Sequence, residues 1–327
     1  MKLVATQDDR DLAAMLRGLL AARGADPWDA LGAAGILGLG IPEEFGGSGG
    51  SLAELGVFAR EGGRALCPFR TYSTVFAAQA VYMLGGDAAR HRWLPDLAAG
   101  RCAATTALWN ANDAADCTPA LRADREPDGS WRLTGTADFV NDAETADLMV
   151  VSGMDASGRT FGFVANLRGP GVAVRPLTLM GGHAAACVRF DEVMVDDALN
   201  DGRPLDRDQL RRAANAAIAL SSLDLVGVGE AVLDRTVAYT TMRHQFGRPI
   251  ASFQAAQHIV ADMHIALTAA RLAAQAAVFR IGRGDVAVRD ATCRSPWRPC
   301  FRRASRRPSR RPARSTHAKF LARARLL

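Results

Sequence analysis

Apolar residues recur with helical spacing through the first hundred residues of the chain. The segment Thr6-Gln7-Asp8-Asp9 has the form of a capping box, and five apolar residues then fall on one helical face. Ser51-Leu52-Ala53-Glu54 repeats the capping pattern before a second stripe, and the apolar stretches 71–84 and 87–99 are each followed by glycine. We therefore predict an N-terminal helical domain over residues 1–102.

A glycine-rich segment, residues 41–50, separates the first two of these helices. It lacks the preceding strand and the glycine spacing of a phosphate-binding loop, so we interpret it as a turn.

The pattern changes near residue 103, where short apolar runs alternate with turn signals such as Asp128-Gly129. Six short strands without intervening helices favour an antiparallel β-barrel or sandwich, and we assign this central domain to residues 103–200. The runs are residues 131–134, 148–151, 161–165, 172–174, 187–190 and 193–195.

Helical spacing returns after residue 205 in two long segments, Asp208 to Arg243 and Phe253 to Arg280. Two long antiparallel helices make half of a four-helix bundle and cannot bury both of their faces alone. We predict an incomplete C-terminal helical bundle over residues 205–284, and thus an α+β multidomain protein with the order helical, β, helical.

The last segment, residues 285–327, breaks every pattern. Between residues 289 and 327, twelve arginines and Lys319 against Asp290 give a local charge of +12. Because the net charge of the whole chain is +6, the first 288 residues carry a net charge of −6. Trp297 and Phe301 are isolated among Arg, Pro and Ser, and no helical or strand period is present. Two interpretations of this tail stay open: a frame slip in GC-rich coding DNA, or a basic arm for nucleic acid or an acidic membrane surface.

The rest of the composition is that of a globular protein, with 49% hydrophobic and 23% charged residues. No unbroken apolar run reaches the ~18 residues of a membrane span, and no signal-peptide pattern opens the chain, so we expect a cytoplasmic protein that does not bind membranes. The six cysteines and six histidines show no zinc or paired-ligand spacing, and we expect no metal site.

The junction of the two long helices carries a specific motif. The segment Arg243-His244-Gln245-Phe246-Gly247-Arg248-Pro249-Ile250, followed by Phe253-Gln254, Gln257-His258 and Ala261-Asp262-Met263, resembles the acyl-CoA dehydrogenase family. Three further stretches are similar to that family in the same order, and the resemblance covers roughly residues 10–284. They are residues 41–47, 135–147 and 181–195.

The resemblance implies FAD as cofactor, an acyl-CoA thioester as substrate, a homo- or hetero-oligomer and an electron-transferring flavoprotein as electron acceptor. Family members oxidise the Cα–Cβ bond: a carboxylate removes the α proton and the β hydrogen leaves as hydride to the flavin. That chemistry requires a base aimed at Cα and a site dry enough to protect the enolate-like state. Acyl-CoA oxidases and flavin monooxygenases share the fold and stay open as alternatives.

The resemblance also implies site residues. Arg243, Gln245 and Phe246 match residues that hold FAD across a subunit interface, and Gln254 matches a glutamine beside the cofactor. Phe139 and Asn141 match the aromatic and Thr/Ser pair that lies against the flavin ring; Asn141 keeps a hydrogen-bond donor but changes its reach. The alternative is a helix-end core role for Phe246 and a surface cation at Arg243.

Three departures from the family pattern bear on activity. The family's Thr-Glu…Gly-Ser-Asp loop is replaced by residues 107–113, as in divergent members of steroid and branched-substrate degradation. No catalytic base is evident: the family's early helical base position holds Ala217, and Asp224, two turns along the same face, is the nearest carboxylate.

The third departure is the tail, which stands where the family has its last two helices. We therefore expect a FAD-dependent acyl-CoA dehydrogenase-like oxidoreductase with impaired folding and turnover in this form. The alternatives are a non-catalytic partner subunit of a hetero-oligomeric acyl-CoA dehydrogenase and a nucleic-acid binder that uses its basic tail.

Overall fold

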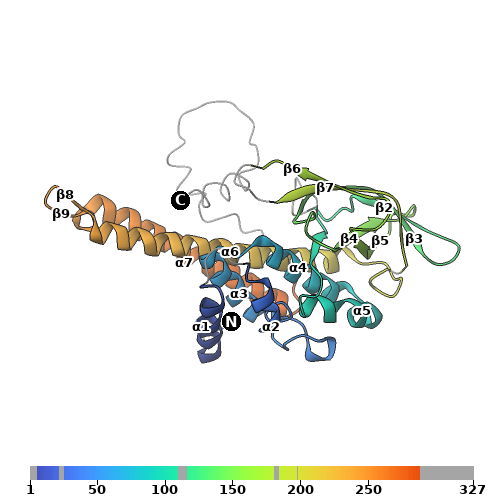
Figure 1. The fold of residues 1–327 in the computed structure, drawn as a ribbon, viewed down its shortest axis with the longest axis horizontal. Coiled ribbons are helices and arrows are strands. Elements are labelled where there is room, and N and C mark those ends of the chain that lie inside the picture. Colours follow the sequence, from blue (N-terminus) through green and yellow to red (C-terminus); the bar gives the residue numbers. More distant parts are fainter. Residues whose placement is uncertain (1–5, 22–25, 110–115, 180–183, 197, 288–327) are drawn as a thin grey trace.

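The computed structural model describes residues 6–21, 26–109, 116–179, 184–196 and 198–287. It shows a group of helices, a β-sheet domain at one end and a pair of long helices that runs across the middle of the view and projects beyond both (Figure 1). The helical group contains α1 (Gln7–Leu19), α2 (Trp28–Ala33), the 3-10 turn η1 (Glu43–Phe45), α3 (Leu52–Ala65), α4 (Phe69–Leu84) and α5 (Asp87–Ala98).

Both predicted capping boxes are present. Thr6 Oγ1 accepts from the amide of Asp9 at 3.1 Å, and the Asp9 carboxylate accepts from the amide of Thr6 at 2.8 Å. Glu54 in the same way accepts from the amide of Ser51 at 2.8 Å. Each box satisfies amides that a helix N-terminus would otherwise leave unbonded, which is why α1 and α3 begin at these residues.

The glycine-rich segment is a turn, as predicted. Gly46 follows η1 with φ 79°, a left-handed conformation that glycine adopts without strain. An added Cβ at Gly47 would lie 2.1 Å from the carbonyl oxygen of Ile41, so this turn also depends on a close backbone approach.

The central domain is one seven-stranded sheet with the order β1-β4-β2-β3-β7-β6, in which β5 pairs with β4. Its strands are β1 (Ala104–Ala107), β2 (Leu121–Arg125), β3 (Trp131–Asn141), β4 (Leu148–Met154), β5 (Thr160–Asn166), β6 (Val172–Leu177) and β7 (Ala185–Val195). The three-part order of the chain is confirmed.

The pairing within the sheet corrects the expected antiparallel arrangement. Four ladders are antiparallel, but β4 runs parallel to both β1 and β2, so the sheet is mixed. β1 and β2 have no predicted counterpart, and the separate runs 187–190 and 193–195 form the single strand β7. The missed strands are four and five residues long, which is too short for a clear period-2 signal.

The two long helices lie close to their predicted bounds, at α6 (Arg207–Met242) and α7 (Gln254–Gly282). Between them come the short strands β8 (His244–Gln245) and β9 (Arg248–Pro249) and the 3-10 turn η2 (Ile250–Ser252). Leu220, Leu223 and Ala277 belong to the same core as Leu55 and Phe58 of α3. The N-terminal domain thus supplies the apolar face that covers one part of the helical pair.

By length and composition alone, α6 and α7 are each apolar enough to cross a membrane. The most apolar windows of α6 and α7 are 44% and 28% buried inside the protein, and α6 packs on α3. The arginine-rich tail predicted over 285–327 lies, from residue 288 onward, outside the described residues.

Candidate functional site

The motif that links the two long helices forms a hairpin at the far end of the molecule (Figure 1). Arg243 ends α6 in an extended conformation, and its carbonyl accepts from the amide of Ile250 at 2.8 Å, which closes the hairpin. Gln245 pairs with Arg248 in the two-residue ladder. The strand pair therefore positions Arg243 and Gln245 at the tip of a rigid helical pair.

Phe246 occupies the turn of this hairpin and is 92% exposed. Its backbone has φ 51°, a left-handed conformation unusual for an aromatic residue, and Gly247 follows at φ 78°. Its ring lies edge-on to the ring of Phe253, with 6.2 Å between the two ring centroids. The Cζ atom of the Arg248 guanidinium lies 4.2 Å from the centroid of the Phe253 ring. The side chain of Phe246 is thus presented outward, which contradicts the alternative that it is a helix-end core residue.

Polar groups at this tip match the chemistry of a dinucleotide. Arg243, Gln245 and Gln254 are all exposed, and Arg243 forms no ion pair with any described residue. A guanidinium supplies up to five N–H donors suited to a pyrophosphate, and each glutamine amide supplies two more.

The other predicted pair, Phe139 and Asn141, lies at the end of β3. Between Ala137 and Val140 the register against β7 shifts by one residue, so Asp138 and Phe139 form a β-bulge. Phe139 has φ 53° and is 54% exposed, although it lies within a strand. The bulge turns its ring outward, as a residue that stacks on a flat ligand requires.

The backbone at Asn141 is fixed from the neighbouring strand. Thr105 of β1, which is buried, donates its hydroxyl to the carbonyl of Asn141 at 2.7 Å. Asn141 also pairs with Ala185 of β7. Its backbone position is therefore set by two strands at once.

The structure does not bring the two predicted sets together within one chain. The hairpin with Arg243, Gln245 and Phe246 and the sheet with Phe139 and Asn141 lie toward opposite ends of the long axis (Figure 1). A single cofactor can contact both sets only where a second subunit places its hairpin beside the sheet of the first.

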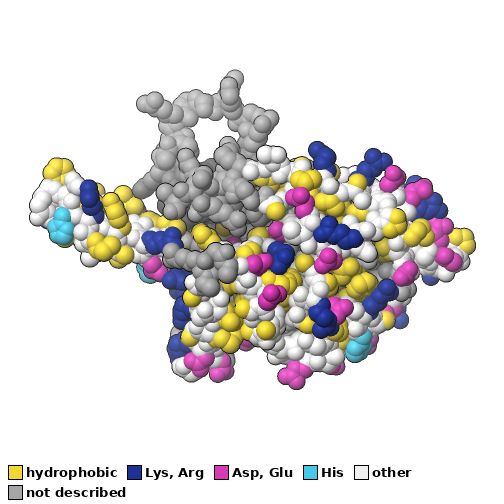
Figure 2. All heavy atoms as spheres, viewed as in Figure 1, with side chains coloured by type: hydrophobic (Ala, Val, Ile, Leu, Met, Phe, Trp, Pro, Cys, Tyr) yellow, Lys and Arg dark blue, Asp and Glu magenta, His cyan; other side chains and the backbone are white. Residues whose placement is uncertain are grey.

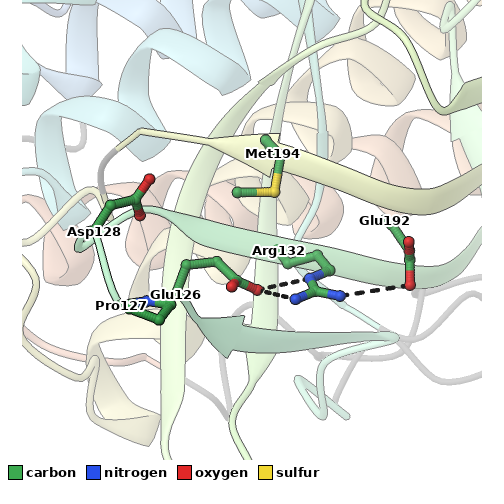
Figure 3. Close-up of a pocket in the computed structure, with 6 residues that line it drawn as sticks. All are labelled: Glu126, Pro127, Asp128, Arg132, Glu192 and Met194. Atoms are coloured by element: carbon green, nitrogen blue, oxygen red, sulfur yellow. Dashed lines mark hydrogen bonds and ion pairs between the residues drawn. The ribbon is translucent and has the colours of Figure 1, made fainter.

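A surface hollow that the structure contains has none of the predicted residues in its lining. It has a volume of about 480 Å³ and lies beside the β2–β3 turn (Figure 3). Arg132 in its floor bonds Glu126 at 2.7 Å through Nε and contacts Glu192 at 3.5 Å. Since its charged groups already pair with one another, this hollow is not a candidate active site.

No carboxylate stands at the expected base position. Ala217 is buried in α6, in the core shared with α3. Asp224 lies against α3, where a Cβ added to Gly63 would be 2.0 Å from its carbonyl oxygen. Residues 110–113 of the divergent loop lie outside the described residues. Within the described ranges, no three His, Cys, Asp or Glu side chains gather as a metal site would require.

The sequence analysis missed a set of buried polar residues in α4. Thr71, Ser73, Thr74 and Gln79 are each less than 10% exposed, in a helix that is otherwise apolar. Polar residues in a helix that was expected to be buried were the signal in the sequence, because buried hydroxyls and amides generally bond to other parts of the protein.

Two parts of the chain match known domains. Residues 12–101 match the acyl-CoA dehydrogenase N-terminal domain, and residues 210–293 match the acyl-CoA dehydrogenase C-terminal domain. The second match extends past the predicted end of the C-terminal domain at residue 284.

Individual proteins that this chain resembles are acyl-CoA dehydrogenases as well. The acyl-CoA dehydrogenase FadE12 of Mycobacterium tuberculosis is 26% identical over 277 residues, which are 79% of this chain and 69% of the relative. The acyl-CoA dehydrogenase IpdE2 of Mycolicibacterium smegmatis is 28% identical over 237 residues, which are 72% of this chain and 60% of the relative.

Solved structures share the fold. A steroid acyl-CoA dehydrogenase variant, Tcur3481-Tcur3483, has a TM-score of 0.77 at 27% identity, over 87% of this chain and 81% of that one. The ChsE4-ChsE5 complex of M. tuberculosis has a TM-score of 0.78 at 26% identity, over 89% and 82%. A glutaryl-CoA dehydrogenase of Mycobacterium smegmatis in complex with FADH2 shares the fold with a TM-score of 0.73 at 20% identity, over 92% and 85%. Two domain matches in chain order and a common fold over most of the chain show that this protein is an enzyme of the acyl-CoA dehydrogenase family, whose members are FAD-dependent oxidoreductases.

Proposed function

We propose that this chain binds FAD between subunits and takes part in the α,β-dehydrogenation of an acyl-CoA thioester. The observation that carries the proposal is the hairpin at the tip of the helical pair, where an exposed aromatic residue and a cluster of donors lie far from the sheet of their own chain. Such a hairpin completes a site only on a neighbouring subunit.

The donor set fits a flavin dinucleotide. Arg243, with Gln245 beside it, supplies the charge and donors for the pyrophosphate, and Gln254 adds an amide at the start of α7. Phe139 and Asn141 supply an aromatic face and a donor for the isoalloxazine ring. No buried carboxylate competes with the cofactor phosphates at the tip, since none of residues 234–266 is buried.

Apolar surface on the helical pair supports an oligomer. We name residues 234–266 the arm; its exposed large apolar side chains are Val237, Tyr239, Met242, Phe246, Ile259 and Ile265. Yellow apolar patches are visible along it in Figure 2. A stable subunit interface is expected to cover such side chains, because extended exposed apolar patches are characteristic of binding surfaces.

When bound, FAD supplies the hydride acceptor. This chain's own residues would hold the flavin and exclude water from it: Arg243 would orient the pyrophosphate, and Phe139 and Asn141 would hold the ring. An electron-transferring flavoprotein is the proposed electron acceptor, and the cytoplasm is the proposed compartment.

A non-catalytic partner subunit is the second candidate function. Ala217 stands, buried, where some family members carry the base, so the carboxylate that removes the α proton would come from another chain. The ChsE4-ChsE5 complex is a named two-component assembly of this fold. A steroid or branched acyl group is the proposed substrate class, since the steroid acyl-CoA dehydrogenase is among the similar structures.

The test is FAD binding by the full chain, alone and co-expressed with a neighbouring acyl-CoA dehydrogenase subunit. Arg243→Ala is expected to weaken FAD binding at least about tenfold, a loss of ~1.4 kcal/mol, because a charge-assisted contact is lost. Arg207→Ala, which removes an exposed arginine of α6 outside the hairpin, is the matched control and is expected to bind FAD normally.

The two candidate functions differ in stoichiometry and turnover. A homo-oligomer that reduces its flavin with acyl-CoA supports the enzyme. Flavin bound and reduced only in a mixed oligomer supports the partner subunit. Protein without flavin in either preparation contradicts both.

A further inference from the structure

The end of β3 is joined to the N-terminal helical domain by a buried hydrogen bond. Ser73 of α4 donates its hydroxyl to the carboxylate of Asp142 at 2.7 Å. Ser73 is 3% exposed and Asp142 is 8% exposed. A carboxylate taken out of water is costly unless it is hydrogen-bonded, so this contact is strongly favoured over an open arrangement.

Asp142 stands directly after Asn141 and three residues after the bulged Phe139. Its φ is 53°, a left-handed conformation that Asp tolerates better than most residues. Its amide donates to the carbonyl of Ala184 at 3.0 Å, and its carbonyl accepts from the amides of Thr145 and Ala146, each at 3.0 Å. The backbone therefore turns sharply here, immediately beyond the residues proposed to meet the flavin ring.

Three elements converge on this turn. Thr105 of β1 fixes the carbonyl of Asn141, the segment before β7 holds the amide of Asp142, and α4 holds its carboxylate through Ser73. The contact to α4 joins the helical domain to the sheet at this point through the side chains of Ser73 and Asp142. This hydrogen bond therefore helps to orient the Phe139–Asn141 segment relative to the helical domain.

We infer that Ser73 and Asp142 are positioning residues for the flavin-ring half of the site: their hydrogen bond fixes the end of β3 so that Phe139 and Asn141 face the ring in one orientation. The inference rests on the proposed function, because Phe139 and Asn141 are placed at the flavin there. Neither Ser73 nor Asp142 contacts the cofactor itself.

The test compares two hydroxyls of the same helix. Ser73→Ala removes the donor to Asp142, whereas Thr74→Val removes the neighbouring hydroxyl, which accepts from the amide of Ala104 at 3.0 Å and donates to its carbonyl at 3.3 Å. Both variants lose one buried side-chain partner between α4 and the sheet domain. Both are therefore expected to unfold at a lower temperature than the wild type.

Only Ser73→Ala is expected to change the affinity for FAD and the spectrum of the bound flavin. We expect FAD affinity to fall about tenfold, and the absorption band of the bound flavin to lose fine structure as the ring environment becomes less ordered. Ser73→Thr, which restores a hydroxyl, is expected to recover both properties in part. Unchanged affinity and spectrum in Ser73→Ala, or equal changes in Thr74→Val, would overturn the inference.

Amide hydrogen exchange in the flavin-free protein separates this inference from the proposed function. Ser73→Ala is expected to speed exchange at residues 140–146 more than Thr74→Val does, because the turn loses its anchor to α4. If the wild type binds no FAD, the proposed function fails, and the exchange result alone decides whether Ser73 fixes the end of β3. Equal exchange in the two variants overturns that as well.

Discussion

The pair of long helices consists of two regions with the same alanine-rich texture and opposite environments. The inner region, from the start of α6 to Leu233 and from Leu267 to the end of α7, contains all the buried residues of both helices. The arm, residues 234–266, contains none. Apolar side chains are present in both, so hydrophobicity alone did not determine which region would be buried.

Close backbone approach explains why the inner region is covered. A Cβ added to Gly227 of α6 would lie 2.0 Å from the carbonyl oxygen of Arg60, and one added to Gly63 of α3 would lie 2.0 Å from that of Asp224. These glycines let α3 and α6 approach backbone to backbone, which buries the side chains around them. Among the described residues, none buries any part of the arm in this way.

Ion pairs mark the boundary between the regions. Glu230 bonds Arg60 of α3 at 2.7 Å and lies 3.5 Å from Arg64, while Asp234 bonds Arg64 at 2.6 Å. Beyond these contacts α6 leaves α3 and continues only beside α7. The comparison shows that one helix can be a core element along one half and an interface element along the other.

The largest expected effect tests the close approach. Gly227→Ala should lower the free energy of unfolding by about 2–3 kcal/mol, because a backbone clash cannot be relieved by a side-chain rotation and outweighs the ~1 kcal/mol gain in helix propensity. Gly18→Ala in α1, where a Cβ meets nothing within 4 Å, is the control and should raise stability by about 0.5–1 kcal/mol. Urea unfolding measures both, and equal stabilisation by the two changes would contradict this account of the inner region.

The next prediction concerns the arm. Ile259 is 61% exposed, and Ile259→Asp should weaken subunit association at least about tenfold, or ~1.4 kcal/mol, because an interface would bury an unpaired charge. The free energy of unfolding of the isolated subunit should change by no more than about 0.5 kcal/mol. Sedimentation equilibrium measures the association.

Met194→Asp makes the matching change on the sheet, where Met194 is 53% exposed. It should leave association unchanged. An arm variant that associates like the wild type would show that the arm is solvent-exposed in the assembly and would remove the support for a shared flavin site.

The last prediction concerns chemical reactivity and leaves stability aside. Burial raises the pKa of the Cys67 thiol, at the end of α3, to about 12. Because the thiolate is the reactive form, a raised pKa keeps Cys67 protonated at neutral pH, and alkylation should accelerate only as the pH rises toward that value. A cysteine introduced in the arm by Ile259→Cys should react at least about a hundredfold faster at pH 7.

Timed iodoacetamide labelling followed by mass spectrometry distinguishes the two thiols. Similar rates at Cys67 and at the introduced cysteine would mean that the contact between α3 and the inner region opens readily, and the contrast between the two regions would lose its basis.

The sequence predicted those features that depend on neighbouring residues. The boxes at Thr6 and Ser51 and the two long helices are encoded by local spacing, and the structure contains each of them. The outward position of Phe246 agrees with the role that the hairpin motif implied. Its role at a flavin, like those of Gln254 and Asn141, stays a prediction.

Tertiary structure alone decided the features that depend on residues distant in the chain. The parallel pairing of β1 with β4, the Ser73–Asp142 hydrogen bond and the division of the helical pair into a buried region and an exposed arm involve partners tens to more than a hundred residues apart. Local periodicity records which face of an element is apolar, but it does not record which other element covers that face. For this reason the sequence by itself determined the order of the three parts and the motif at the arm tip, whereas the contacts that separate core from interface became visible only in the folded chain.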